Sequence, residues 1–350
     1  RCAAFLAGSR QMIDGAVTWS ILGDNPASVR AIFYHGVIDR GSRDHYFSRL
    51  FADVHEFENE ISWLARHWRP MLLAEVAQHM AEGKPLPAKA VHVSFDDGFR
   101  NNLLAAEVLE RHRVPWTLFV VVDAVLDGYR PWYSRLADAV GVTANVQRPD
   151  GSVAELSRAG DKWAFDQEVK AELMAGPAAR TDATLDAILR LPGMRATPEE
   201  SWPYLTPEEL RQLHQSGVEI GNHSAHHLNL TRCDDAILEA EVEGSRQRLE
   251  GALGAPVRFF AYPDGRYDKR VERAVAAGHD LAMSVWRPGA RGSRYAMPRR
   301  CGGVGNEAFS AALQQDVRLD DLREWAWSMW PRLPREVRHR VRPRSGLSGG

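Results

Sequence analysis

The chain has 350 residues, of which 44% are hydrophobic and 26% are charged, and its formal net charge at pH 7 is −2. This near-neutral balance argues against a nucleic-acid-binding protein, which usually carries a large positive charge. The longest apolar runs have the length of strands, whereas a membrane-spanning helix needs about 20 apolar residues. Three cysteines, Cys2, Cys233 and Cys301, are too few for a disulfide framework, and they leave reduced thiols or one pair as the alternatives.

Short apolar segments rich in Val, Phe and Ile alternate with helical patterns along the chain. We expect strands at residues 29–34, 90–95, 116–122, 218–221, 257–262, 281–285 and 295–301. We expect helices at residues 50–68, 101–111, 234–253 and 268–277, and one that starts at a capping box at 206–209. This alternation predicts an α/β protein, either a (β/α) barrel or a doubly wound sheet.

Two regions interrupt the alternation. Residues 135–203 contain helical patterns and loops but no clear strand, which predicts a helical insertion between the third and fourth strands. The insertion either caps the rim of the barrel or is a solvated excursion. We expect residues 1–320 to form a single barrel with this insertion, followed by a tail at 321–350.

The tail at 321–350 is rich in tryptophan and arginine. Tryptophan beside arginine is typical of peripheral membrane contact or of contact with anionic lipid-linked glycans. The alternative is that the tryptophans pack on the barrel and the arginines are solvated.

Polar residues follow four of the predicted strands directly. They are Tyr34-His35, Asp96-Asp97, Asn222-His223 and Pro263-Asp264. In a (β/α) barrel the carboxyl ends of the strands form one rim, and active sites are built there. We therefore expect these four strand ends to converge on one site.

Two of these strand ends carry candidate metal ligands. Adjacent carboxylates at Asp96 and Asp97 suggest either a bound cation or an ordinary Asp-Asp-Gly turn. His223 and His227 are four residues apart, and on a helical turn such a pair faces one way and can bind one metal. Two imidazoles and one carboxylate give an open hydrolytic metal centre, which leaves the other carboxylate to act as a base.

These residues resemble the motifs of a known family. Residues 94–98 read S-F-D-D-G, similar to the (T/S)-F-D-D-G motif of the polysaccharide deacetylases, which form the NodB-homology domain of carbohydrate esterase family 4. Residues 223–227 match its H-(S/T)-x-x-H motif, and residues 260–265 resemble its third motif. Residues 33–37 resemble the Y-H-x-V opening of the branch that contains poly-N-acetylglucosamine deacetylases. The resemblance runs from about residue 29 to about residue 303.

The resemblance implies a distorted (β/α)7 barrel and one divalent metal ion. Zinc is the first expectation, with cobalt, nickel, iron or manganese as alternatives. Carried over to this sequence, the metal ligands are Asp97, His223 and His227, and the general base is Asp96. The metal polarises the amide carbonyl and water, and the base accepts the proton of the water.

The resemblance also implies a general acid, and this chain departs from the family pattern at one position of the third motif. The opening histidine, His35, is the candidate acid, and His226 and His279 rank below it. The alternative for His35 is a purely structural role at its strand end. Relatives with an arginine in the third motif use it to orient the base, whereas this chain has Ala261 there.

Substrate contacts are expected from the remaining motif residues. The candidates are Tyr262, Pro263, Asp264, Trp132 and Arg299. A backbone N–H near Asp264 can serve as an oxyanion donor. Trp132 and its neighbour Tyr133 either stack on a sugar or are buried. Arg299 either binds a substrate anion or pairs with a buried carboxylate.

The expected function is metal-dependent hydrolysis of N-acetyl groups on the sugar of a polysaccharide or glycan precursor. The alternatives are deformylation or another amide hydrolysis on a lipid-linked sugar or small amide, and a glycan-binding module without activity. The expected partner is an N-acetylated glycan, and the oligomeric state stays open. A bacterial cytoplasmic or membrane-peripheral location is expected, and an exported form stays open because the chain begins at Arg1 and not at Met.

Overall fold

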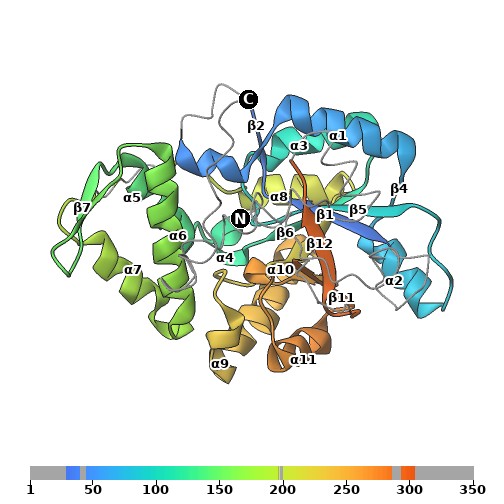
Figure 1. The fold of residues 1–350 in the computed structure, drawn as a ribbon. Helices are drawn as coiled ribbons and strands as arrows, with labels where there is room; N and C mark the ends of the chain where they lie inside the picture. The colour runs from blue at the N-terminus through green and yellow to red at the C-terminus, as the bar shows by residue number, and fades with distance from the viewer. Residues whose placement is uncertain (1–28, 40–44, 196, 198–199, 286–292, 304–350) are drawn as a thin grey trace, which may run out of the picture.

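The computed structural model describes residues 29–39, 45–195, 197, 200–285 and 293–303. Seven of its strands belong to one closed parallel barrel. They are β1 (Arg30–Tyr34), β5 (Ala90–Phe95), β6 (Trp116–Val120), β9 (Glu219–Asn222), β10 (Phe259–Ala261), β11 (Leu281–Val285) and β12 (Met297–Cys301). Each pairs with the next, and β1 closes the ring by pairing with both β5 and β12 (Figure 1). A short strand, β4 (Arg69–Pro70), pairs with β5 outside the ring.

Helices surround this barrel. They are α1 (Val54–His67), α2 (Leu73–Ala81), α3 (Asn102–His112), α4 (Val122–Leu126), α8 (Pro207–Gln215), α9 (Asp235–Glu239), α10 (Ser245–Leu253) and α11 (Lys269–Gly278). A short 3-10 helix, η2 (Tyr46–Leu50), and the paired strands β2 (Val37–Ile38) and β3 (Ala52–Asp53) precede α1. Further 3-10 turns are η4 (Leu230–Arg232) and η6 (Pro263–Gly265). The expected distorted (β/α)7 barrel and all seven expected strands are confirmed.

Most of the expected helices are present, with two differences in detail. The expected helix at 50–68 begins later, because the side chain of Asp53 accepts hydrogen bonds from the N–H groups of His55 and Glu56 and starts α1 there. The expected helix at 234–253 is continuous, but its middle, η5 (Ala240–Gly244), is a π-helical turn. The capping box at Thr206 and Glu209 is present as expected.

The insertion contains three helices and one hairpin. Its elements are α5 (Trp132–Val142), β7 (Asn145–Gln147), β8 (Val153–Glu155), α6 (Ala159–Ala175), η3 (Ala178–Arg180) and α7 (Thr181–Leu189). The expectation of no strand was wrong, since β7 and β8 pair antiparallel around a turn at Asp150 and Gly151. Strands of three residues are too short to show the alternating pattern that marks a strand in sequence.

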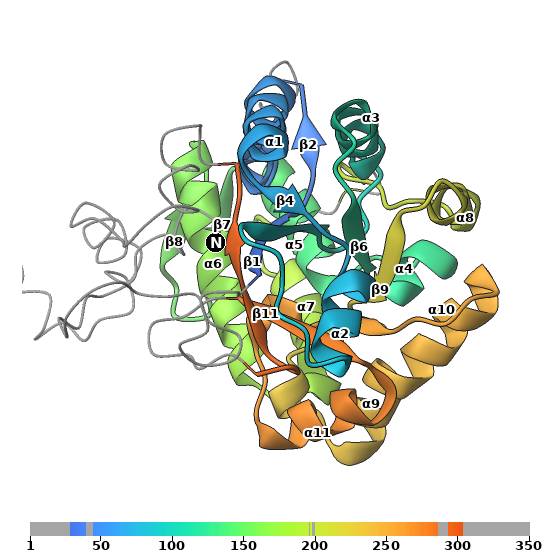
Figure 2. The same cartoon turned by 90° about the vertical axis from the view of Figure 1, so that its right-hand side faces the viewer.

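The two ends of the barrel differ in what covers them. Interior residues such as Phe119, Phe259 and Met283 form one apolar cluster with α2, whose residues Leu73 and Val76 are fully buried in it. The carboxylate of Glu219, at the start of β9, accepts hydrogen bonds from the N–H groups at the start of α2. Helix α2 therefore covers the amino end of the barrel, as Figure 2 shows, and the insertion lies on the opposite side in Figure 1.

Two sequence expectations concern residues that are not described. The tail at 321–350, and with it the expected membrane contact, lies outside the described residues. Within the described part of the chain, no helix has both the length and the apolar character needed to cross a bilayer.

Gly221 gives a test of the interior packing. A Cβ atom at this position would lie 2.4 Å from the ring of Phe119 and 3.2 Å from the carbonyl oxygen of Phe259. We therefore expect Gly221→Ala to lower the free energy of unfolding by about 1–3 kcal/mol, because the buried ring must move. Gly251, in α10, has open space around the same position, so Gly251→Ala should leave stability unchanged or raise it. Equal urea midpoints for the two variants would contradict this packing.

Candidate active site

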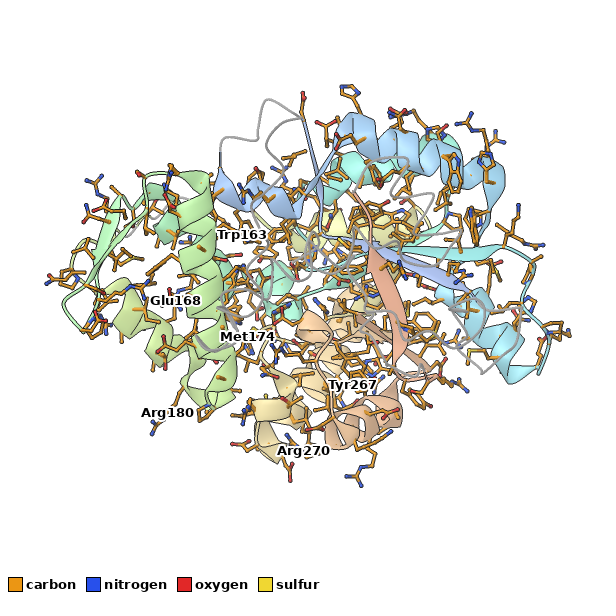
Figure 3. The ribbon with its side chains drawn as sticks, viewed as in Figure 1. Trp163, Glu168, Met174, Arg180, Tyr267 and Arg270 are labelled. Atoms are coloured by element: carbon orange, nitrogen blue, oxygen red, sulfur yellow. The ribbon has the colours of Figure 1, made fainter. Side chains whose placement is uncertain are left out.

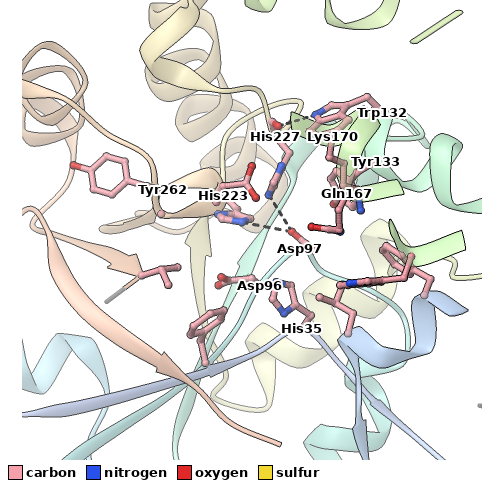
Figure 4. Close-up of a pocket in the computed structure, with 17 residues that line it drawn as sticks. His35, Asp96, Asp97, Trp132, Tyr133, Gln167, Lys170, His223, His227 and Tyr262 are labelled. Carbon is pink, nitrogen blue, oxygen red and sulfur yellow. Dashed lines mark hydrogen bonds and ion pairs between the residues drawn. The ribbon is translucent and has the colours of Figure 1, made fainter. Parts of the chain in front are cut away.

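One pocket gathers the polar ends of the barrel strands. Figure 4 shows His35, Asp96, Asp97, His223 and His227 converging in it. These residues follow β1, β5 and β9, so the expected convergence of these strand ends is what the structure shows.

Three of these residues form a compact group of potential metal ligands. One ligand atom from each of Asp97, His223 and His227 lies within 4.8 Å of the other two. Oδ1 of Asp97 is 3.5 Å from Nε2 of His223 and 3.6 Å from Nε2 of His227. This buried oxygen accepts no hydrogen bond from the described residues. Two imidazole nitrogens and one carboxylate oxygen, with a buried oxygen left unsatisfied, fit a divalent metal of the zinc type.

The loop that carries both histidines is not helical. The expected helical turn was wrong, since residues 223–229 form an irregular loop in which Ser224 and His227 have positive φ angles. The N–H of His223 donates to the carbonyl of Val120, and the N–H of His227 donates to Oγ of Ser224. Asp97 also has a positive φ, of 75°. Strained backbone of this kind is concentrated at functional sites, where surrounding bonds must hold it in place.

His226 anchors the histidine loop from behind. Its Nε2 is 3.0 Å from a carboxylate oxygen of Asp123, and its Nδ1 is 2.6 Å from one of Glu241. Hydrogen bonds to Asp123 and Glu241 raise the pKa of His226 to about 10. Glu241 lies in the π-helical turn η5, and Asn222 donates to the carbonyl of Val242 in the same turn. The π-helical turn therefore holds His226 of the loop and also Asn222, the strand residue just before the loop.

Neither lower-ranked acid candidate is part of the pocket lining. His226 is held in the ion pairs just described. His279 is buried against the ring of Phe260, and burial lowers its pKa to about 4. His35 does line the pocket, beside Asp96 and Asp97.

The charges of the pocket determine which groups are ionised. Burial alone would lower the pKa of His223, but the carboxylates of Asp96 and Asp97 outweigh it and raise that pKa. Burial opposes ionisation of Asp97, yet His223 and His227 hold the pKa of its carboxyl well below the usual range. Burial lowers the pKa of His35 despite the nearby carboxylates. At neutral pH, Asp97 is thus a carboxylate and His35 a neutral imidazole.

Asp96 is held by an arginine from the last barrel strand. Two guanidinium nitrogens of Arg299 donate to the two carboxylate oxygens of Asp96, at 2.7 and 2.8 Å. Arg299 is fully buried, with its guanidinium between the rings of Phe33 and Phe119. It therefore pairs with a buried carboxylate, which was one of its two expected roles, and it is not part of the pocket lining. An arginine on β12 thus supplies the contact to Asp96 that Ala261 cannot make.

The two aromatic residues at the start of α5 also contact the metal-ligand group. The indole N–H of Trp132 donates to the carbonyl oxygen of His227. The ring of Tyr133 meets the ring of His227 edge to face at 4.7 Å, and its hydroxyl accepts a hydrogen bond from the hydroxyl of Tyr204 at 2.9 Å. Burial and the nearby Asp97 carboxylate raise the pKa of Tyr133 well above its usual range. Trp132 and Tyr133 are almost fully buried, although both line the pocket.

The third motif forms the opposite wall. Tyr262 and Asp264 line the pocket, whereas Pro263 does not. The hydroxyl of Tyr262 donates to the carbonyl of Tyr295, and Figure 4 shows its ring directed away from the metal-ligand group. Asp264 has a positive φ of 54° within η6. Substrate contact by these residues stays a prediction.

Three pocket residues come from the insertion and were not predicted. Trp163, Gln167 and Lys170 lie on one face of α6, at spacings of four and three residues, and line the pocket. The insertion thus contributes to the wall of the pocket, and it is not only a solvated excursion. The helical spacing of a tryptophan with two polar residues was the only signal in the sequence, and surface helices often show it.

The pairing of Asp96 with Arg299 has a measurable consequence for stability. Arg299→Met leaves a buried carboxylate without its cation, so we expect a loss of about 3–5 kcal/mol in the free energy of unfolding at neutral pH. An unpaired buried carboxylate binds a proton more readily when folded than when unfolded, so this deficit should shrink as the pH falls towards 4. Arg299→Lys keeps the charge and should lose less. Denaturant unfolding between pH 4 and 8 tests this, and a deficit independent of pH would contradict it.

Trp132 should matter for metal binding through its hydrogen bond to the carbonyl oxygen of His227. Hydrogen bonds to metal-ligating residues orient them, so Trp132→Phe should weaken zinc binding about ten-fold or more. Trp202→Phe is the matched control, because it also removes a buried indole N–H, but outside the pocket lining. Competition with a chromophoric chelator measures both affinities. Equal affinities in the two variants would show that the Trp132 indole does not orient His227.

Comparisons with known proteins place this site in a family. The family model described as polysaccharide deacetylase matches residues 83–283, which is more than half of the chain. YxkH of Bacillus subtilis (strain 168) is 25% identical over 309 residues, which cover 86% of this chain and 81% of YxkH. A poly-β-1,6-N-acetyl-D-glucosamine N-deacetylase of Escherichia coli (strain K12) is 32% identical over 72 residues, or 20% of this chain.

Some of these matches are local, and the structural likeness is broader. The local matches among curated relatives, that to the Escherichia coli enzyme included, span 10% to 27% of the relatives' own lengths. The structure of the Streptococcus pyogenes deacetylase PplD in complex with acetate aligns with a TM-score of 0.55 at 13% identity. That alignment covers 83% of this chain and all of PplD, and it shows a shared fold. The chain belongs to the polysaccharide deacetylase family.

Proposed function

We propose that this protein is a metal-dependent hydrolase that removes N-acetyl groups from the sugars of a glycan. The observation that carries the proposal is one pocket in which Asp97, His223 and His227 form a metal-ligand group beside a second carboxylate, Asp96. A three-ligand group leaves coordination positions open for water and substrate.

Asp97, His223 and His227 would hold the metal ion, with zinc as the first expectation. When bound, such an ion supplies Lewis acidity towards the amide carbonyl and towards water. A hydrogen bond orients His223 for this role, because its Nδ1 is 2.7 Å from the carbonyl oxygen of Ala261. A proton on Nδ1 leaves Nε2, the atom that faces Asp97, as the nitrogen with a lone pair.

Asp96 is the proposed general base. Its two oxygens accept hydrogen bonds from Arg299, and each carboxylate oxygen keeps a second lone-pair direction that can accept the proton of the attacking water. The arginine fixes the carboxylate in one orientation, which favours proton transfer along one direction.

His35 is the proposed general acid that protonates the departing amine. It lines the pocket with Asp96 and is neutral before reaction, since burial lowers its pKa. The acid role therefore requires His35 to gain a proton during turnover, and the proton that Asp96 takes from water is the nearest source.

The substrate class follows from the family and from the chemistry of the group removed. The Escherichia coli relative is named for an N-acetylglucosamine polymer, which supports an N-acetylated amino sugar as substrate. Hydrolysis breaks the amide C–N bond and adds water across it, giving acetate and a free amine on the sugar. A formyl group could be removed by the same chemistry, so the identity of the released acid distinguishes the two reactions.

Asp96 and Asp97 provide the decisive comparison. Asp96→Asn should lower acetate release at least about 100-fold while the metal is retained, because the base is lost and the ligands are not. Asp97→Asn should lose the metal as well. Release of acetate and formate from N-acetylated and N-formylated glucosamine oligomers, with metal content measured on the same samples, tests both expectations.

The metal requirement is tested on the unmodified protein. Chelation should abolish acetate release, and zinc or another divalent ion should restore it. Activity that survives complete metal removal would overturn the proposal, and so would loss of the metal in Asp96→Asn.

A further inference from the structure

The insertion helix α6 has two buried sides with different surroundings. Phe165, Val169 and Leu173 belong to the main apolar cluster that the insertion shares with the barrel. Trp163, Gln167 and Lys170 line the pocket, and the partly buried Trp163 also packs against that cluster. Figure 3 shows Trp163 on the side of α6 that faces the barrel. We call Trp163, Gln167 and Lys170 the α6 face.

The α6 face is organised by a buried carboxylate. Asp166 is fully buried, and it accepts hydrogen bonds from the Tyr46 hydroxyl at 3.2 Å and from Nε2 of Gln167 at 2.9 Å. Nζ of Lys170 lies 2.9 Å from the same carboxylate and 5.0 Å from the centre of the Phe47 ring. Asp166 therefore fixes two polar side chains that face the pocket.

Helix α6 is also held in place relative to the metal-ligand group. Its end is tied to the histidine loop, because the side chain of Asn229 donates to the carbonyl of Met174 at 2.8 Å. Asn229 is itself buried, two residues beyond His227. The α6 face is thus a fixed wall of the site.

The chemistry of this wall suits a sugar ring. A partly exposed indole can cover the apolar C–H face of a pyranose, while the carboxamide of Gln167 and the ammonium of Lys170 can bond its hydroxyls. We propose that the α6 face is a subsite for a second, uncharged sugar unit, next to the one that loses its acetyl group. This rests on the proposed function, and it makes an oligomer or polymer the preferred substrate over a single sugar.

The charge balance of the subsite favours a neutral sugar over an anionic one. The ammonium of Lys170 is paired with Asp166, so the two carry no net charge towards the ligand. The carboxylates of Asp96 and Asp97 lie in the same pocket and would repel an anionic substituent. Lys170 therefore acts as a hydrogen-bond donor with a fixed position.

The test compares chain lengths in the metal-loaded full chain. Acetate release is measured with N-acetylglucosamine and with its β-1,6-linked pentamer. We expect kcat/KM to be about ten-fold or more higher for the pentamer, and Trp163→Ala to lower the pentamer-to-monomer ratio about ten-fold. Lys170→Met should lower it as well. Glu172→Ala, an exposed position on the same helix, is the control and should keep the ratio.

A ratio that is the same in Trp163→Ala and Glu172→Ala would overturn the subsite, and so would equal losses on both substrates. If Lys170→Met lowered kcat/KM more for a pentamer that carries succinyl groups than for the unmodified pentamer, the neutral-sugar assignment would be overturned. Calorimetric titration of the pentamer into the same proteins separates this proposal from the proposed function. If none of the proteins releases acetate but Trp163→Ala binds the pentamer more weakly, the subsite is supported and the deacetylase proposal is contradicted. If Trp163→Ala binds the pentamer as the unmodified protein does, the subsite is overturned.

Discussion

The site depends on giving two adjacent, buried carboxylates different partners. Asp96 and Asp97 are each 3% exposed, and neighbouring charges in such a place strongly oppose one another. The fold gives each its own cationic partner. Asp96 receives a guanidinium from β12, and Asp97 faces two imidazoles that can share a metal with it. One carboxylate is thereby committed to a fixed ion pair, and the other to a coordination site.

Sequence patterns were sufficient for the barrel and for the centre of the site. Each barrel strand is a short apolar run that ends in polar residues, so its position and its rim end can both be read locally. The parallel barrel then brings Asp97 and His223 together, although they are far apart in the chain. The hairpin of the insertion was missed because its strands are too short to show alternation, and the π-helical turn because its pattern differs little from that of an α-helix.

The parts that could not be predicted are contacts between distant segments with no local pattern of their own. From the sequence alone, Arg299 was equally consistent with binding a substrate anion and with pairing with a buried carboxylate. Only the closed ring shows that its guanidinium reaches Asp96. The contact of Tyr133 with the ring of His227 depends on where the insertion begins, and the α6 face depends on how α6 packs. Sequence motifs thus identify the candidate reacting groups, whereas the residues that position them are found only from the packing.

The closure of the ring has a consequence for the order in which the molecule folds. Strands β1 and β12 come from opposite ends of the described chain, and their pairing is the most non-local contact in the barrel. Non-local pairing is slow to form, because a long loop must close first. Arg299 lies on β12, so Asp96 gains its counter-ion only when that strand docks. Until that strand docks, Asp96 lacks its counter-ion, and burying its unpaired carboxylate would cost free energy. Burial of this carboxylate is therefore stable only in the completed ring.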